Sequence, residues 1–328
     1  MSFSDLLNVI MSSLISFSFL SLATFGLILI FKTSTTANFA QGSLGVFGAF
    51  VTSYIIDQQG VNDLLGTSNV VITSIAQLII PMLIGMFITF LAGLFIQTVI
   101  FKNARYTNAA TKQIITMGLV IVITGLIPLM FGSSITRISF AFSKETVSIF
   151  NILVPIHNLI TLGLATVIIV TIFILLKYTK WGLGVRSVAS NERVAGLMGI
   201  NTDVINALSW GIAGALGALS AITYTAAIGT LASSSMVEIQ INSFYASILG
   251  GFSTFYGPLA GAFILTTGQA LFPTILVHWN LAEWSNTILY LSIMIVVLIK
   301  PVGIFGKKVV KKVWCYEKIL SRKINSFC

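Results

Sequence analysis

Residues 177–204 read KYTKWGLGVRSVASNERVAGLMGINTDV and form a charged stretch between long apolar segments on either side. A charged loop of this length, holding a short amphipathic helix, is typical of a docking surface for a soluble partner. We therefore predict a membrane protein whose energy source is another subunit. The charged side chains of the stretch are Lys177, Lys180, Arg186, Glu192, Arg193 and Asp203.

The composition of the whole chain also favours a membrane protein. Of the 328 residues, 56% are hydrophobic and only 8% are charged, and the mean hydropathy is +0.99. Soluble domains carry roughly 25% charged residues. Because a spanning helix needs about 20 apolar residues, the charge-free windows predict an all-α polytopic membrane protein with about eight to ten transmembrane helices. These windows cover residues 70–101, 113–136, 146–176, 205–237 and 239–282.

The net charge of +9 comes mostly from three basic segments. Cytoplasmic loops of membrane proteins are rich in Lys and Arg, so we expect all three in the cytoplasm, with the N-terminus outside and the C-terminus inside. The charge therefore reflects orientation in the lipid bilayer and does not predict a nucleic-acid partner. The basic residues are Lys102, Arg105 and Lys112; Lys177, Lys180, Arg186 and Arg193; and, in the tail, Lys300, Lys307, Lys308, Lys311, Lys312, Lys318, Arg322 and Lys323.

Hydropathy and loop charge together predict nine spans, of which the second, seventh and ninth are short enough to be tilted, broken or re-entrant. Residues 1–306 would form one transmembrane domain that includes a cytoplasmic loop at 177–204, and residues 307–328 would form a basic cytoplasmic tail. The expected spans cover residues 9–31, 44–56, 70–100, 114–131, 155–176, 205–227, 239–249, 259–276 and 287–299.

Some kinds of site are missing from the sequence. The phosphate-binding string G-x-x-x-x-G-K-[ST] does not occur, so we do not expect this chain to hydrolyse ATP by that route. The expected spans hold no Asp, Glu, Lys or Arg, which ion-coupled carriers commonly place within the membrane. Two His residues, no carboxylate cluster and two Cys residues in the basic tail predict no catalytic residue and no metal site.

The segment after the first expected span joins two amides to a run of glycines. It reads ANFAQGSLGVFGAF over residues 37–50. Glycine permits non-helical backbone, and irregular backbone at membrane depth occurs only inside protein or beside a cavity. We therefore predict that Asn38, Gln41 and Gly42 line a solute path. The alternative is a plain cytoplasmic turn.

A second glycine-rich string, GGFSTFYGPLAG, covers residues 250–261. It contains a helix-breaking Gly-Gly, a Gly-Pro and a G-x-x-x-G spacing. We predict that Gly250, Gly251 and Gly257 lie in a turn opposite the Asn38 segment and complete the path. The alternative is close helix packing alone, since small residues let helices approach in lipid. We assign packing only to three further glycines, Gly211, Gly214 and Gly217.

Residues 190–199 predict a helix of about two turns. A Ser-Asn pair can cap its start, an acidic side chain suits its first turn, and a glycine can end it. Val194, Leu197 and Met198 follow i, i+3, i+4 spacing and form an apolar stripe. Helices this short are marginal alone, so the stripe should pack on a soluble partner or, alternatively, on the lipid interface. The predicted contact residues are Ser190, Asn191, Glu192, Arg193, Val194, Leu197, Met198 and Gly199.

Taken in order along the chain, these strings resemble the LivH-type permease of branched-chain amino acid ABC importers. The resemblance extends over nearly the whole chain and implies that residues 189–200 couple a permease domain to an ATPase. The matching pieces are NFAQG and GAF within residues 38–50, GVRSVA at 184–189, AGLMGIN at 195–201, GGF at 250–252 with Gly257, and KPVGIFGK at 300–307.

The resemblance implies a transporter subunit of the bacterial inner membrane rather than an enzyme. It would work with a second permease subunit, two cytoplasmic ABC ATPase subunits and an extracytoplasmic binding protein. ATP and Mg would be used by the partner ATPase, and this chain would bind no cofactor. The expected solute is a branched-chain or other small amino acid, moved by alternating access. The alternative is a self-sufficient secondary carrier or facilitator for urea, an amide or a nucleoside, which would purify without an ATPase.

We expect single Cys reporters to place Lys112, Arg186 and Lys308 in the cytoplasm and Asp63 and Glu283 outside, because Lys and Arg are retained on the cytoplasmic side. The measurement is labelling by an impermeant thiol reagent in intact cells, in a background in which Cys315 and Cys328 are replaced. Labelling at position 186 without permeabilisation would contradict this orientation.

Overall fold

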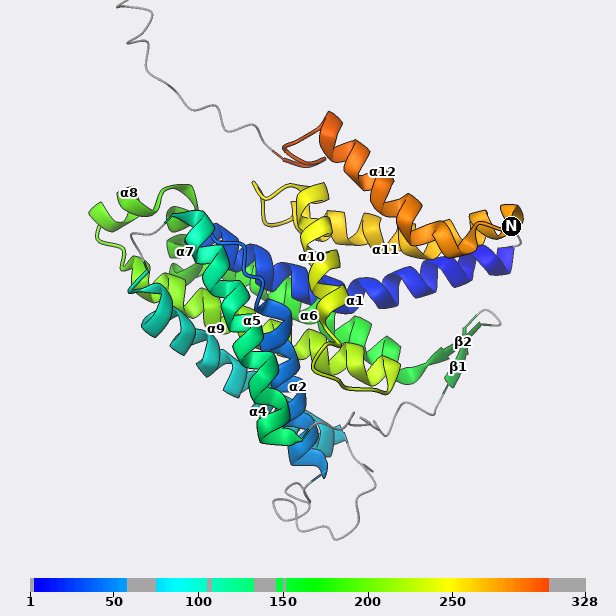
Figure 1. The fold of residues 1–328 in the computed structure, drawn as a ribbon, viewed down its shortest axis with the longest axis horizontal. Helices are drawn as coiled ribbons and strands as arrows, with labels where there is room; N and C mark the ends of the chain where they lie inside the picture. Colours follow the sequence, from blue (N-terminus) through cyan, green and yellow to red (C-terminus); the bar gives the residue numbers. More distant parts are fainter. Residues whose placement is uncertain (1–2, 58–74, 105–107, 133–145, 150–151, 307–328) are drawn as a thin grey trace, which may run out of the picture.

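The computed structural model describes residues 3–57, 75–104, 108–132, 146–149 and 152–306 (Figure 1). Within these residues almost the whole chain is helical, and the only strands are β1 (Thr146–Ile149) and β2 (Ile152–Pro155), which pair antiparallel. The all-α prediction is therefore confirmed. Asp63, Lys308 and the predicted tail at 307–328 lie outside the described residues.

Seven helices in the described part of the chain are long and apolar enough to cross a membrane, so the protein is a multi-pass membrane protein. Each of the nine expected spans coincides with a helix, but two of these helices are not among the seven, because each has fewer than 18 residues. The short ones are α2 (Gln41–Asp57) and α10 (Val237–Gly250). The others are α1 (Phe3–Ser34), α4 (Ile75–Phe95), α5 (Ala109–Phe131), α6 (Ile156–Tyr178), α9 (Thr202–Ile228), α11 (Gly257–Leu276) and α12 (Ser285–Ile299). Helix α12 reaches 18 residues only together with the helical turn before it, Ala282–Trp284.

Helices α1 and α9 form the centre of the bundle. Helix α9 packs against α1, α2 and α4, while α1 also contacts α6, α10 and α11. About 72% of the apolar window of α1 and of α9 is buried, against 17% for α5 and α12, which places the latter two at the periphery (Figure 1). Since lipid is as apolar as these side chains, close packing rather than expulsion from water favours the central contacts.

Glycines let α2 approach α9 closely. A Cβ on Gly45 would overlap the carbonyl of Gly217, and a Cβ on Gly214 would overlap the carbonyl of Thr89 on α4. The packing predicted for Gly214 and Gly217 is confirmed. Gly45 and Gly48 lie in helix, as the expected span at 44–56 requires. One expectation is wrong: Gly42 also lies in regular helix, because its small size serves contact with α10 rather than irregular backbone.

Gly45→Ala should destabilise the folded protein by about 1–3 kcal/mol, because its new methyl group overlaps backbone of α9 that cannot rotate away. Thermal melting of the purified protein in detergent measures the effect. Gly118→Ala on α5 is the matched control, since no atom lies within 4 Å of its added Cβ. Equal melting temperatures for the two variants would show that α2 and α9 are not in contact.

Candidate functional site

The chain reverses direction inside the protein after α1. Residues 35–40 are non-helical, and α2 starts at Gln41, whose side-chain amide donates to the Ala213 carbonyl of α9 and lies where a Cβ on Gly26 would sit. Gly26 precedes the end of α1 by eight residues, which is about 12 Å of helix. The irregular segment therefore returns alongside α1, and α2 begins within the bundle.

Two amides satisfy the backbone at this reversal. Asn38 and Gln41 are almost fully buried. The Asn38 Oδ1 accepts from the Ala40 N–H at 3.0 Å, and its Nδ2 donates to Gln41 Oε1 at 3.4 Å. A buried backbone group without a partner is costly, so these bonds stabilise the turn. Asn38 and Gln41, both predicted to line the path, thus stabilise the turn through hydrogen bonds to the protein.

The element opposite this turn is the first half of α10. Gln240 Nε2 donates to the Asn38 carbonyl at 3.1 Å, and the rings of Phe39 and Phe244 lie 4.8 Å apart. A Cβ on Gly42 would lie 3.1 Å from the Met236 carbonyl. Helices α2 and α10 therefore begin side by side, although about 200 residues of chain separate them.

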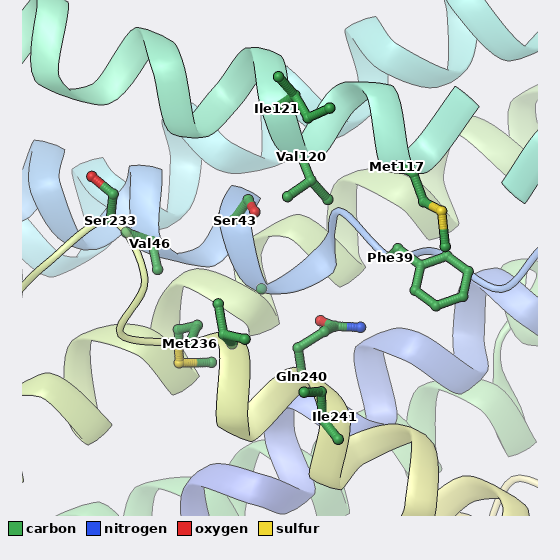
Figure 2. A pocket seen from close by; sticks show the side chains of 12 residues that line it. Phe39, Ser43, Val46, Met117, Val120, Ile121, Ser233, Met236, Gln240 and Ile241 are labelled. Carbon is green, nitrogen blue, oxygen red and sulfur yellow. The ribbon is translucent and has the colours of Figure 1, made fainter. Parts of the chain in front are cut away.

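A partly open cavity of about 360 Å³ lies where these two helices begin, and α5 forms a further wall of it (Figure 2). Pockets of this size hold small molecules. Of the predicted path residues Gly42 lines it, whereas Asn38 and Gln41 do not. Among the described residues that line it, none has an ionisable side chain. The lining residues are Phe39, Gly42, Ser43, Val46, Met117, Val120, Ile121, Ser233, Met236, Val237, Gln240 and Ile241.

Sequence reasoning missed Gln240, Ser233 and the α5 wall. An amide in the first turn of the unusually short expected span at 239–249 was the available signal for Gln240. Nothing in the sequence marked Met117, Val120 or Ile121, which read as ordinary lipid-facing residues.

The prediction that the Gly250–Gly257 turn lies opposite the Asn38 segment is wrong. It follows the far end of α10, where Lys32 Nζ donates to the Ser253 carbonyl and the Ile304 N–H donates to the Leu249 carbonyl at 2.8 Å. Gly251, with φ +94°, lies against Val302 and residue 306. The strings at 250–257 and 300–306 therefore pack on each other and on the end of α1.

The predicted docking helix exists as α8 (Glu192–Leu197), which follows α7 (Lys180–Ser190). Asn191 caps it by accepting from the backbone N–H groups of Arg193 and Val194 at 3.1 and 3.2 Å. Gly199 has φ +82°, the left-handed conformation that ends a helix. Of the two predicted caps Asn191 is therefore the one used, and Ser190 is the last residue of α7.

The three stripe residues on and just after α8 point away from the bundle. Val194, Leu197 and Met198 are 52%, 86% and 78% exposed, whereas Ala195 is buried against the protein. Arg193 is exposed as well. Glu192 is half-buried and accepts from Asn206 Nδ2 at 3.4 Å. Its carboxylate therefore faces α9, on the side away from the stripe.

Two of the three predicted cytoplasmic segments meet at one end of the bundle. Ser34, Lys102, Lys112, Glu192 and Asp203 line the same small pocket. The shared end agrees with a common side of the membrane for these loops, and which side faces the cytoplasm stays a prediction.

Comparison with known proteins identifies relatives along the chain. Residues 9–298 match the family described as branched-chain amino acid transport system / permease component. The chain is 30% identical over 143 residues to the high-affinity branched-chain amino acid transport system permease protein LivH of Salmonella typhimurium, and this alignment covers 44% of each protein. It therefore spans less than half the length of that curated relative.

Two other relatives differ in coverage and in name. The probable branched-chain amino acid transport permease protein LivH of Methanocaldococcus jannaschii is 26% identical over 312 residues, covering 91% of this chain and 92% of the relative. The autoinducer 2 import system permease protein LsrC of Yersinia enterocolitica is 27% identical over 142 residues, covering 42% and 38%. No solved structure matches the chain.

Proposed function

The chain belongs to the family of branched-chain amino acid transport permease components, and on that premise we propose that it is the permease subunit of an ATP-driven importer. It acts in the bacterial inner membrane with a second permease subunit, two cytoplasmic ABC ATPase subunits and an extracytoplasmic binding protein. The ATPase subunits use ATP and Mg, and this chain binds no cofactor. Its solute is a branched-chain or other small amino acid.

The exposed apolar stripe of α8 is the observation that carries the proposal. Three apolar side chains project from a helix that is capped at its start and ended by a left-handed glycine. The exposed surface therefore belongs to an ordered helix. Burying such side chains contributes about 1.5–3 kcal/mol each, a substantial part of a small interface. We assign this surface to a groove of the ATPase.

Alternating access follows if the ATPase contacts α8 differently in its open and closed states. Binding energy shifts a conformational equilibrium only by the difference in affinity between the two states. The first helix after α8 is α9, which starts at Thr202 and runs through the centre of the bundle beside α1, α2 and α4. A displacement of α8 would therefore move α9, which follows it in the chain, and α9 packs on α2 beside the cavity.

Leu197→Asp should uncouple or dissociate the ATPase, because it places a charge in an apolar groove. The permease itself should still insert, since the residue is 86% exposed. The measurement is solute-stimulated ATP hydrolysis by the reconstituted complex, with copurification of the ATPase scored alongside. Leu197→Met is the matched control and should retain both. Gly199→Val should do similar harm, because a β-branched residue disfavours the left-handed conformation at that position.

Normal stimulation and normal stoichiometry in Leu197→Asp would leave the docking assignment without support, and α8 would then be a helix lying on the lipid interface. Transport by the chain alone in liposomes, with no ATPase purifying alongside it, would favour a self-sufficient facilitator instead.

Asn38→Ala should impair solute uptake while the complex still assembles, because the Asn38 side chain positions the first turn of α2 beside the cavity. Uptake in cells and copurification of the partners are measured together. Gln269→Ala is the control, since this half-buried amide on α11 contacts Tyr290 and does not line the cavity. Full uptake in the double variant Asn38→Ala, Gln41→Ala would show that the segment has no part in the path.

A further inference from the structure

A small cavity of about 20 Å³ joins separate parts of the chain at the end of the bundle that holds α8. Lys102 and Lys112 line it from the end of the turn after α4 and from the start of α5, and Glu192 and Asp203 line it from the first turns of α8 and α9. We call these four residues the charged cluster. Lys112, Glu192 and Asp203 are half-buried. Opposite charges attract more strongly when they are partly removed from water, so the cluster favours contact between the start of α5 and the starts of α8 and α9.

Helix α8 is attached to the charged cluster on the side away from its exposed stripe. Glu192 accepts from Asn206 Nδ2 at 3.4 Å, and the Asn206 side chain is buried beside the same small cavity. A protein that binds the stripe therefore acts on a helix whose opposite face carries one of the four charges.

Helix α5 connects the charged cluster to the larger cavity at the starts of α2 and α10. Lys112, Thr116 and Val120 follow i, i+4, i+8 spacing, which places them on one face of the helix. Thr116 is buried, and its Oγ1 accepts from the Phe39 N–H at 3.3 Å. Val120 lines the larger cavity together with Phe39 (Figure 2). One face of α5 therefore contacts the charged cluster, the chain reversal and the larger cavity in succession.

Elsewhere α5 is loosely packed in the described part of the chain. Only 17% of its apolar window is buried, and its main contacts are with α2. No neighbouring atom lies within 4 Å of a Cβ added to Gly118 or Gly125. Its far end is fixed by Phe131, whose ring lies 5.7 Å from the ring of Phe50 on α2. A helix is a rigid element, so displacing the start of α5 would tilt it about Phe131 and move the cavity wall.

Two buried acceptors beside the charged cluster have no partner in this arrangement. Gln97 and Asn206 are buried and line the small cavity, and neither Gln97 Oε1 nor Asn206 Oδ1 accepts a hydrogen bond from any described residue. Gln97 lies in a π-helical turn, Ile96–Phe101, a geometry found mostly as single turns and often at functional sites. Unpaired buried acceptors are costly, which favours a second arrangement in which they gain donors.

We propose that the charged cluster couples α8 to α5, so that binding of an ATPase on α8 moves the α5 wall of the larger cavity. Lys112 is the positioning residue, because among the four charges it is the one on α5. Displacement of α8 moves Glu192, the cluster shifts the start of α5, and α5 tilts about Phe131. The proposal rests on the proposed docking of the ATPase, and it adds a second connection beside the one through α9.

The test measures the cavity wall directly, in the complex with the copurified ATPase in lipid nanodiscs. Cys315 and Cys328 are replaced, and Ser43→Cys introduces a thiol on α2 in the lining of the larger cavity. The rate of labelling by a small maleimide is compared without nucleotide and with a non-hydrolysable ATP analogue. We expect the two rates to differ by about fivefold or more, the lower end of usual coupling between sites.

Lys112→Glu should bring the ratio of the two rates close to one while the ATPase still copurifies, because a carboxylate there is repelled by the acidic side chains of the cluster. Lys112→Arg should keep the ratio, and the exchanged pair Lys112→Glu, Asp203→Lys should restore it. Lys180→Glu is the matched control, since this exposed lysine on α7 does not line the small cavity. Rescue by exchange of charges separates coupling from general damage to the fold.

A labelling ratio that nucleotide does not change in the Ser43→Cys chain would overturn the proposal without any further variant. An unchanged ratio in Lys112→Glu, or no recovery in the exchanged pair, would also overturn it. The importer proposal is tested separately: it fails if no ATPase copurifies or if Leu197→Asp leaves the ATPase coupled. If Leu197→Asp uncouples the ATPase but Lys112→Glu keeps the natural ratio, only the connection through α5 fails.

Discussion

The structure depends on one constraint: backbone that leaves helical geometry inside a membrane protein must find its hydrogen-bond partners within the protein. The chain meets this constraint where it turns back after α1. Asn38 caps the turn, Gln41 bonds the carbonyl of Ala213, and Gln240 bonds the carbonyl of Asn38. These amides tie α2, α9 and α10 together at one depth. Neutral amides suit this task because each can donate and accept without the cost of burying a charge.

Two consequences follow from starting α2 and α10 inside the bundle. Their positive ends lie inside the protein instead of in water, beside a cavity whose described lining residues include no Lys or Arg. The helices must also lie close to their neighbours, which the glycines on α2 and α9 permit. The position of the cavity and the close packing of Gly45 on Gly217 are thus parts of the same arrangement, since both need α2 to lie directly against α9.

The charged segment at 177–204 shows how the two ends of the molecule are connected. Thr179, Asn191 and Asn201 each accept a backbone N–H at the start of a helix, which orders the path through α7 and α8 into α9. Glu192 holds α8 to α9 through Asn206, and the stripe remains exposed on the other side. A short helix fixed on one face and open on the other can transmit displacement, because the helix that follows it is a single rigid element.

The sequence by itself determined the fold class, the approximate helix positions, the capping of α8 and the exposure of its stripe. These follow from hydropathy and side-chain chemistry that act over a few neighbouring residues. Only the tertiary structure decided which distant residues meet. It brings Gln240 to Asn38, places α5 beside the cavity, starts α2 at Gln41 inside the bundle, and packs the Gly250–Gly257 turn on residues 300–306 rather than opposite the Asn38 segment. Pairings between helices depend on the depth at which each helix starts and on close packing of small residues. The local sequence pattern of an almost uniformly apolar chain specifies neither of these.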